Sequence, residues 1–182
     1  MMPFAPTCIR SLVVLAMSGT LAGAQTRSAT RATPPVDHGA TTIPVAGTGV
    51  DYLTTALVHS KEETAGGMVQ KSTEIVELMG DLKGRVLYHV TSVFDFVRQT
   101  LVNTGDQVYS GTIAGSAPVM IHDNQFRFDV NLATGNETGR VYLFDHIAGP
   151  KVRCTLDIVG TGLNADENPT FAYKGQCTFL GP

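Results

Sequence analysis

The chain has 182 residues, 43% hydrophobic and 16% charged, which suits one domain with a sizeable core and excludes a disordered chain. Its formal net charge is −3, and its 13 Lys and Arg residues form no run. A nucleic-acid partner therefore has no electrostatic support.

Residues 1–24 are expected to form a secretory signal peptide. Arg10 precedes a short apolar stretch that ends in the small residues "AGA", a pattern typical of a signal cleavage site. The stretch is shorter than the roughly 18–20 apolar residues that a membrane-spanning helix needs. We therefore expect cleavage before Gln25, a secreted or periplasmic protein, and no membrane span.

Residues 25–50 are predicted to form a flexible leader. They are rich in Thr, Ala, Pro and Gly and show no apolar period. Residues 51–182 instead alternate between apolar and polar side chains, which is the period of β-strands. We therefore predict one β domain over residues 51–182.

Predicted strands occupy most of that domain, and no segment favours a helix of ten or more residues. The strands lie at residues 51–60, 67–80, 85–97, 100–115, 124–133, 140–149, 151–160 and 170–180. A turn at Thr104-Gly105-Asp106 is expected to break the fourth of them into a hairpin. Seven to nine strands joined by short turns indicate an antiparallel barrel or sandwich. We expect an all-β, eight-stranded, up-and-down barrel.

Six aromatic side chains are candidates for ligand binding. They are Tyr88, Phe94, Phe96, Phe126, Phe128 and Tyr173. A barrel can hold a small apolar or aromatic molecule in its mouth among such rings. The alternative is that the same rings pack on one another as an ordinary core.

Two cysteines, Cys154 and Cys177, are predicted to form a disulfide. If they face each other in a terminal hairpin, Leu156 lies opposite Gly175 and Ile158 opposite Tyr173. The apolar side chains of both strands then share one face, so a single register satisfies both strands. Directly opposed residues are close enough for a disulfide, and an exported protein meets an oxidising environment.

Asp145 is a candidate catalytic residue whose orientation depends on the strand register. If Val130 lies opposite Leu143, Asp145 points into the barrel, where burial would raise the pKa of its carboxyl group and suit it to acid–base chemistry. A shift of one residue would place Asp145 in water. No cofactor is expected, and no His, Cys or carboxylate spacing predicts a metal site.

The run "VELMGDLKGRVLY", followed by "VYSGTIAG", resembles the allene oxide cyclase-like barrels, which share their fold with the plant dirigent proteins. The resemblance matches Glu77, Gly84 and Tyr88 to the family's Glu, turn Gly and Tyr. Met79 stands where the family has Asn, and "RV" stands where it has Ser-Pro. The resemblance implies an eight-stranded antiparallel barrel, often oligomeric, that holds an apolar substrate in its mouth.

Three functions are compatible with these features. The first is a secreted barrel that binds a small apolar or aromatic molecule in its mouth. The second, implied by the resemblance, is a cyclase or isomerase that uses a carboxylate in the barrel, with Glu77 as the main group and Asp145 as a partner. The third is a structural envelope or surface protein without a ligand. A homo-oligomer is expected from the resemblance.

Overall fold

The computed structural model describes residues 39–181, so the predicted signal peptide at 1–24 and the first part of the leader lie outside the described residues. The described unit is built from strands, with one short 3-10 helix, η1 (Leu53–Thr55). The strands are β1 (Thr41–Asp51), β2 (Leu57–Thr64), β3 (Gly67–Gly80), β4 (Leu82–Asp95), β5 (Thr100–Ile113), β6 (Val119–Asp123), β7 (Arg127–Asn131), β8 (Glu137–Leu143), β9 (Asp145–Ala148), β10 (Val152–Leu163) and β11 (Pro169–Phe179). Within this part of the chain, no helix has the length and apolarity needed to cross a membrane.

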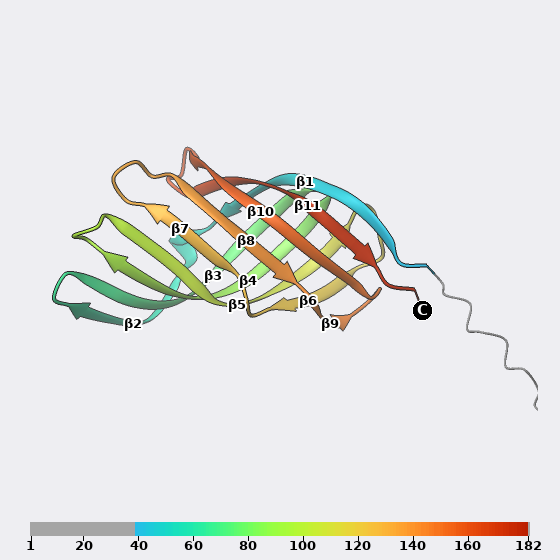
Figure 1. Cartoon of the computed structure of the whole chain (residues 1–182), viewed down its shortest axis with the longest axis horizontal. Helices are drawn as coiled ribbons and strands as arrows, with labels where there is room; N and C mark the ends of the chain where they lie inside the picture. The colour runs from blue at the N-terminus through green and yellow to red at the C-terminus, as the bar shows by residue number, and fades with distance from the viewer. Residues whose placement is uncertain (1–38, 182) are drawn as a thin grey trace, which may run out of the picture. The chain divides into compact units, whose positions relative to one another are not determined.

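Eight of the strands close into an antiparallel barrel (Figure 1). Around the ring, the order is β1, β3, β4, β5, β7, β8, β10 and β11, and β11 pairs with β1 to complete it. Each barrel strand is therefore next to the barrel strand that follows it in the chain. The prediction of an all-β, eight-stranded barrel in a single domain is confirmed, and the sandwich is excluded.

Three further strands extend the barrel wall. β1 pairs with residues 76–80 of β3, and β2 continues along the same edge beside residues 67–73. In the same way, β7 pairs with residues 100–104 of β5 and β6 with residues 107–111. β9 then pairs with β6. In Figure 1, β2 projects at the same end of the barrel as the β4–β5 turn.

The prediction of a flexible leader is wrong for residues 41–50, because they form most of β1. Their small side chains permit close packing rather than flexibility. A Cβ atom at Gly47 would collide with the ring of Tyr173, and one at Gly49 would collide with the ring of Phe171. The small residues of this segment are typical of a linker. In the structure, they allow β1 to pack closely against aromatic rings of β11.

The predicted break at Thr104-Gly105-Asp106 is wrong, since β5 runs without interruption and pairs with β4 along its length. Gly105 has a φ of 155° and lies opposite Val90. A Cβ atom at this position would strike the carbonyl oxygen of His89. This glycine serves a close approach between two strands, and its turn-like sequence context does not produce a turn.

The terminal hairpin has the predicted register. Cys154 lies opposite Cys177, Leu156 opposite Gly175, and Ile158 opposite Tyr173. The cysteines form a disulfide with a Cα–Cα distance of 4.1 Å, and both are fully buried. The disulfide therefore lies inside the barrel and joins two neighbouring strands, β10 and β11.

One half of the barrel is filled by its core. Its most deeply buried apolar side chains include Leu82, Tyr109, Ile113, Ile121, Val152 and the cysteine pair. Tyr173 reaches into this end, where its hydroxyl accepts a hydrogen bond from the Leu82 amide at 2.8 Å. The same hydroxyl lies 3.1 Å from the Met79 carbonyl oxygen, to which it donates. Packing closes this end, and the opposite half is left hollow.

Candidate functional site

The hollow half of the barrel is a cavity of about 660 Å³. This volume lies within the roughly 300–1,000 Å³ range of small-molecule sites. Its mouth is at the end of the barrel where Leu53 and Leu163 are 47% and 67% exposed. Apolar side chains from most of the barrel strands form much of the wall: Val76, Leu78, Val86, Phe94, Leu101, Phe128, Val130, Val141, Leu143, Leu156, Ile158 and Phe171.

Three carboxyl groups interrupt this apolar wall. Asp51 is the last residue of β1, and it lies opposite Val76 of β3. Glu74 lies two residues before Val76 on the same inward face and is 6% exposed. Glu137 begins β8 and pairs with Val130. The closure of the ring therefore brings together carboxyl groups from three separate segments.

Asp51 and Glu74 form a protonated pair. Burial, followed by the charge of Glu74 and a hydrogen bond with it, raises the pKa of Asp51 to about 8. At neutral pH, Asp51 consequently holds its proton and donates it to Glu74. Oδ1 of Asp51 is buried and accepts no hydrogen bond from residues 39–181. Glu74 Oε1 also accepts a hydrogen bond of 2.6 Å from Ser72 Oγ.

Glu137 and Tyr88 complete the ionisable groups of the cavity. Burial raises the pKa of Glu137. Burial also raises the pKa of Tyr88 well above its usual value, and the nearby charges of Asp51, Glu74 and Glu137 add to that rise. No Lys, Arg or His of the described residues lines this cavity. The cavity therefore combines apolar walls with acidic groups and has no cation to balance them.

Three of the six predicted aromatic residues line the cavity: Tyr88, Phe94 and Phe128. The centroid of the Tyr88 ring lies 6.1 Å from that of Phe128, in an edge-to-face arrangement. Phe126 does not line the cavity, because it is buried beneath these rings, with its centroid 4.8 Å from that of Tyr88.

The other two aromatic residues lie elsewhere. Phe96 follows the end of β4 and is 50% exposed. The series of inward-facing side chains of β4 that includes Phe94 therefore ends before Phe96. Tyr173 is buried in the closed half of the barrel, where it bonds to backbone groups. Neither residue lines the cavity.

Glu77, predicted as the carboxylate inside the barrel, projects from the outer surface. Its neighbours Val76 and Leu78 face inward, and the alternation of β3 turns Glu77 the other way. There it accepts a hydrogen bond of 3.0 Å from the Tyr52 hydroxyl and lies opposite Arg85. The inward carboxylate of β3 is Glu74, three residues earlier.

Asp145 also lies outside the barrel. Val130 pairs with Glu137 and not with Leu143, although this register still turns Leu143 inward. Phe144 then interrupts the strand, and its amide bonds to the His122 carbonyl oxygen of β6. The interruption breaks the alternation, so Asp145 is exposed, with Oδ2 3.4 Å from His122 Nδ1.

The sequence reasoning missed the three cavity carboxyl groups for different reasons. Asp51 stood at the edge of the presumed leader, and Glu137 stood inside the presumed turn "TGNETG". Glu74 could have been identified from the sequence, since Glu74, Val76 and Leu78 occupy alternate positions of β3 and therefore lie on the same apolar face. Of the three carboxyl groups, only Glu74 could therefore have been identified from the local sequence pattern, as an ionisable residue on an apolar strand face.

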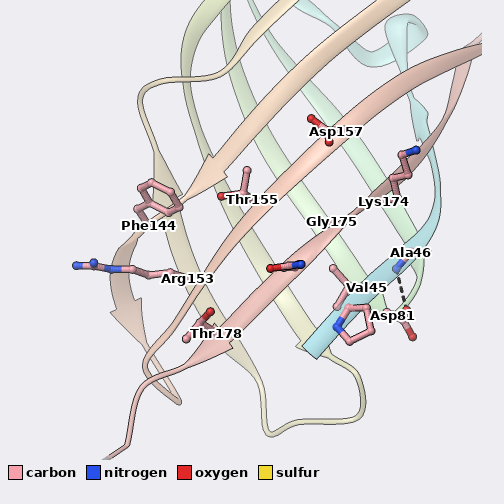
Figure 2. Close-up of a pocket in the computed structure, with 12 residues that line it drawn as sticks. Val45, Ala46, Asp81, Phe144, Arg153, Thr155, Asp157, Lys174, Gly175 and Thr178 are labelled. Atoms are coloured by element: carbon pink, nitrogen blue, oxygen red, sulfur yellow. Dashed lines mark hydrogen bonds between the residues drawn. The ribbon is translucent and has the colours of Figure 1, made fainter. Parts of the chain in front are cut away.

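A second hollow, of about 740 Å³, lies on the outer wall over β1, β10 and β11 (Figure 2). In this view, Arg153 lies at the left of the hollow and Lys174 at the right. Asp157 lies between them, and Asp81 lies below Lys174. Asp81 Oδ2 is already bonded to the Ala46 amide at 2.8 Å. Because its charged groups do not converge, this hollow is a weaker candidate than the barrel cavity.

No family model, curated protein or solved structure matches the chain. The resemblance to allene oxide cyclase-like barrels, and the homo-oligomer that it implies, therefore stay predictions. In the region that the structure describes, no three His, Cys, Asp or Glu residues are placed to hold a metal ion. The candidate site is thus defined by its own geometry: an apolar cavity with an acid pair and a third carboxyl group.

Proposed function

We propose that this protein binds a small apolar or aromatic molecule in the open half of its barrel. The observation that carries the proposal is the cavity of about 660 Å³ with its largely apolar wall. A barrel that served only as a structural surface element would need no such space. The rings of Tyr88, Phe128 and Phe171 would contact the ligand, and burial of its apolar surface would drive binding.

A matched pair of substitutions tests the location of binding. Val76 lines the cavity and Ile75, its neighbour, is 37% exposed on the outer face. A fluorescent apolar probe such as N-phenyl-1-naphthylamine is expected to bind the wild type with increased emission, and the protein has no Trp to interfere. Val76→Phe should reduce binding and Ile75→Phe should not. Equal binding by both variants, each folded by circular dichroism, would remove the cavity as the site.

A second candidate function, an isomerase or cyclase, is favoured by the Asp51–Glu74 pair. Protonated Asp51 can donate a proton to one atom of a bound substrate, while Glu74 can accept one from another, so that the net change is an isomerisation. This assignment replaces Glu77 and Asp145, which lie outside the barrel. Asp51→Asn should then abolish turnover but retain ligand binding, and unchanged turnover would remove the pair from the reaction.

We also propose that the protein is exported. The disulfide between Cys154 and Cys177 supports this location, because such bonds persist in oxidising compartments. The test is the N-terminal sequence and non-reducing mass of the protein recovered from outside the cytoplasm. A mature chain that begins at Gln25 with the cysteines joined is expected. An unprocessed chain with two free thiols would contradict the proposal.

A further inference from the structure

We propose that the cavity selects ligands that carry a protonated amine on an apolar body, and that their binding displaces a proton from the Asp51–Glu74 pair. The inference rests on the proposed binding function and names its ligand class. It follows from the charges, the unpartnered polar groups and the shape of the cavity.

The charges of the cavity have one sign. Asp51 of β1, Glu74 of β3 and Glu137 of β8 line it, and Tyr88 of β4 is the fourth titratable group. The lining residues of β5, β7, β10 and β11 carry no ionisable side chain. A buried carboxylate without a counter-ion is costly, and a ligand ammonium group would supply the missing positive charge.

Two buried oxygens of the cavity wall receive no hydrogen bond within the described part of the chain. Oδ1 of Asp51 and Oδ1 of Asn103 are buried oxygens that accept no hydrogen bond from any described residue. Tyr88 is only 5% exposed and lines the cavity, and its hydroxyl makes no hydrogen bond with the side chains or backbone of the described residues. Its hydroxyl therefore remains available to a ligand. An ammonium group has three N–H donors and no acceptor, which suits such a set of oxygens.

The apolar wall determines the rest of the ligand. Phe94, Phe171, Leu53 and Leu163 line the same cavity as the acid pair and Tyr88. An amphiphile would thus place its cationic head against the carboxyl groups and leave its apolar body among the rings. A ligand with a carboxylate head would meet charges of its own sign, and the cavity should disfavour it.

Proton release follows from the same arrangement. A positive charge beside Asp51 favours the ionised form of its carboxyl group, so the pKa of about 8 in the free protein should fall in the complex. At neutral pH, the free protein holds this proton and the complex does not. Affinity for an amine should consequently rise as the pH increases towards 8, by up to about tenfold per pH unit.

Three naphthalene ligands with different heads provide the test: 1-naphthylmethylamine, 1-naphthalenemethanol and 1-naphthoic acid. Isothermal titration with the mature protein at pH 7.5 should give the amine an affinity about tenfold or more above the alcohol, with the acid weakest. Titration in two buffers of different ionisation enthalpy should show release of about one proton with the amine and none with the alcohol.

The outcomes separate this inference from the function on which it rests. If none of the three ligands binds, the proposed function and the inference both fail. If the alcohol or the acid binds as tightly as the amine, or if the amine binds without proton release, the cavity remains a binding site and only the inference fails. The proton count uses the wild type, so it does not depend on how any variant folds.

Matched substitutions assign the preference to the cavity. Glu74→Gln and Glu137→Gln should each reduce the advantage of the amine over the alcohol by about fivefold or more, since each removes one buried negative charge. Glu77→Gln makes the same chemical change on the outer surface and should leave the advantage unchanged. An equal loss in Glu77→Gln would show that general surface charge, and not the cavity, attracts the amine.

Discussion

Asp51 and Glu74 are hydrogen-bonded carboxyl groups on neighbouring strands, β1 and β3, inside an apolar cavity. They are separated by 22 intervening residues in the chain, and only the pairing of Asp51 with Val76 brings them onto one wall. The pair is the most unusual chemical feature of the barrel, because burial and mutual repulsion keep a proton on Asp51 at neutral pH.

The acid pair should make stability depend on pH. The pKa of Asp51 is raised from 3.8 to about 8, so between these values the folded state holds a proton that the unfolded state has lost. The free energy of unfolding should therefore decrease as the pH rises through this range, and the loss should level off above about pH 8.

Asp51→Asn isolates this contribution, since the amide cannot titrate. Urea midpoints measured at about pH 5 and about pH 8 should differ less in Asp51→Asn than in the wild type. Asp166→Asn, which alters an exposed carboxylate, is the control and should keep the pH dependence of the wild type. The same dependence in Asp51→Asn would mean that other groups cause it.

Tyr173 and Tyr88 should respond differently to loss of their hydroxyl groups. Tyr173→Phe leaves the buried Leu82 amide without its acceptor, and this should lower the free energy of unfolding by about 1–3 kcal/mol. Tyr88→Phe removes a hydroxyl that has no such bond and should change stability by less than about 0.5 kcal/mol. Urea unfolding of both variants checks the contrast, and similar losses would contradict it.

The disulfide should contribute measurably to stability. Cys154 and Cys177 are separated by 23 positions, and breaking their bond frees this loop in the unfolded chain. The paired substitution Cys154→Ala with Cys177→Ala should lower the free energy of unfolding by about 2–4 kcal/mol. Reduction of the unfolded wild type with dithiothreitol should reproduce the loss. No change in the urea midpoint would show that the bond is absent from the protein tested.

Gly47 should tolerate no side chain. A Cβ atom there would collide with the Met79 carbonyl oxygen and the Tyr173 ring, so Gly47→Ala should cost about 1–3 kcal/mol. Gly39→Ala is the matched control, since a Cβ atom at Gly39 meets nothing within 4 Å. Thermal unfolding should show a lower midpoint for the first variant alone. A neutral effect at Gly47 would argue against the close packing of β1 on β11.

Several features of the barrel followed from local sequence. Alternation in β10 and β11 was enough to predict that Cys154 faces Cys177, because one register places most of the apolar residues of both strands on the same face. The same alternation predicted strands without helices, and hence the all-β class. It also held the information that Glu74 shares a face with Val76, although the resemblance directed attention to Glu77.

The site itself was decided by the tertiary structure. The alternation of side chains along a strand determines which face each residue is on. Closure of the ring determines which strands are neighbours and which half of the barrel is filled. Asp51 and Glu137 reach the cavity only because β1 and β8 extend into segments that read as a linker and a turn. Asp145 leaves it because Phe144 bonds to β6 and ends β8. The sequence determined the period of each strand through its local backbone geometry, whereas the meeting of three distant carboxyl groups required the closed barrel.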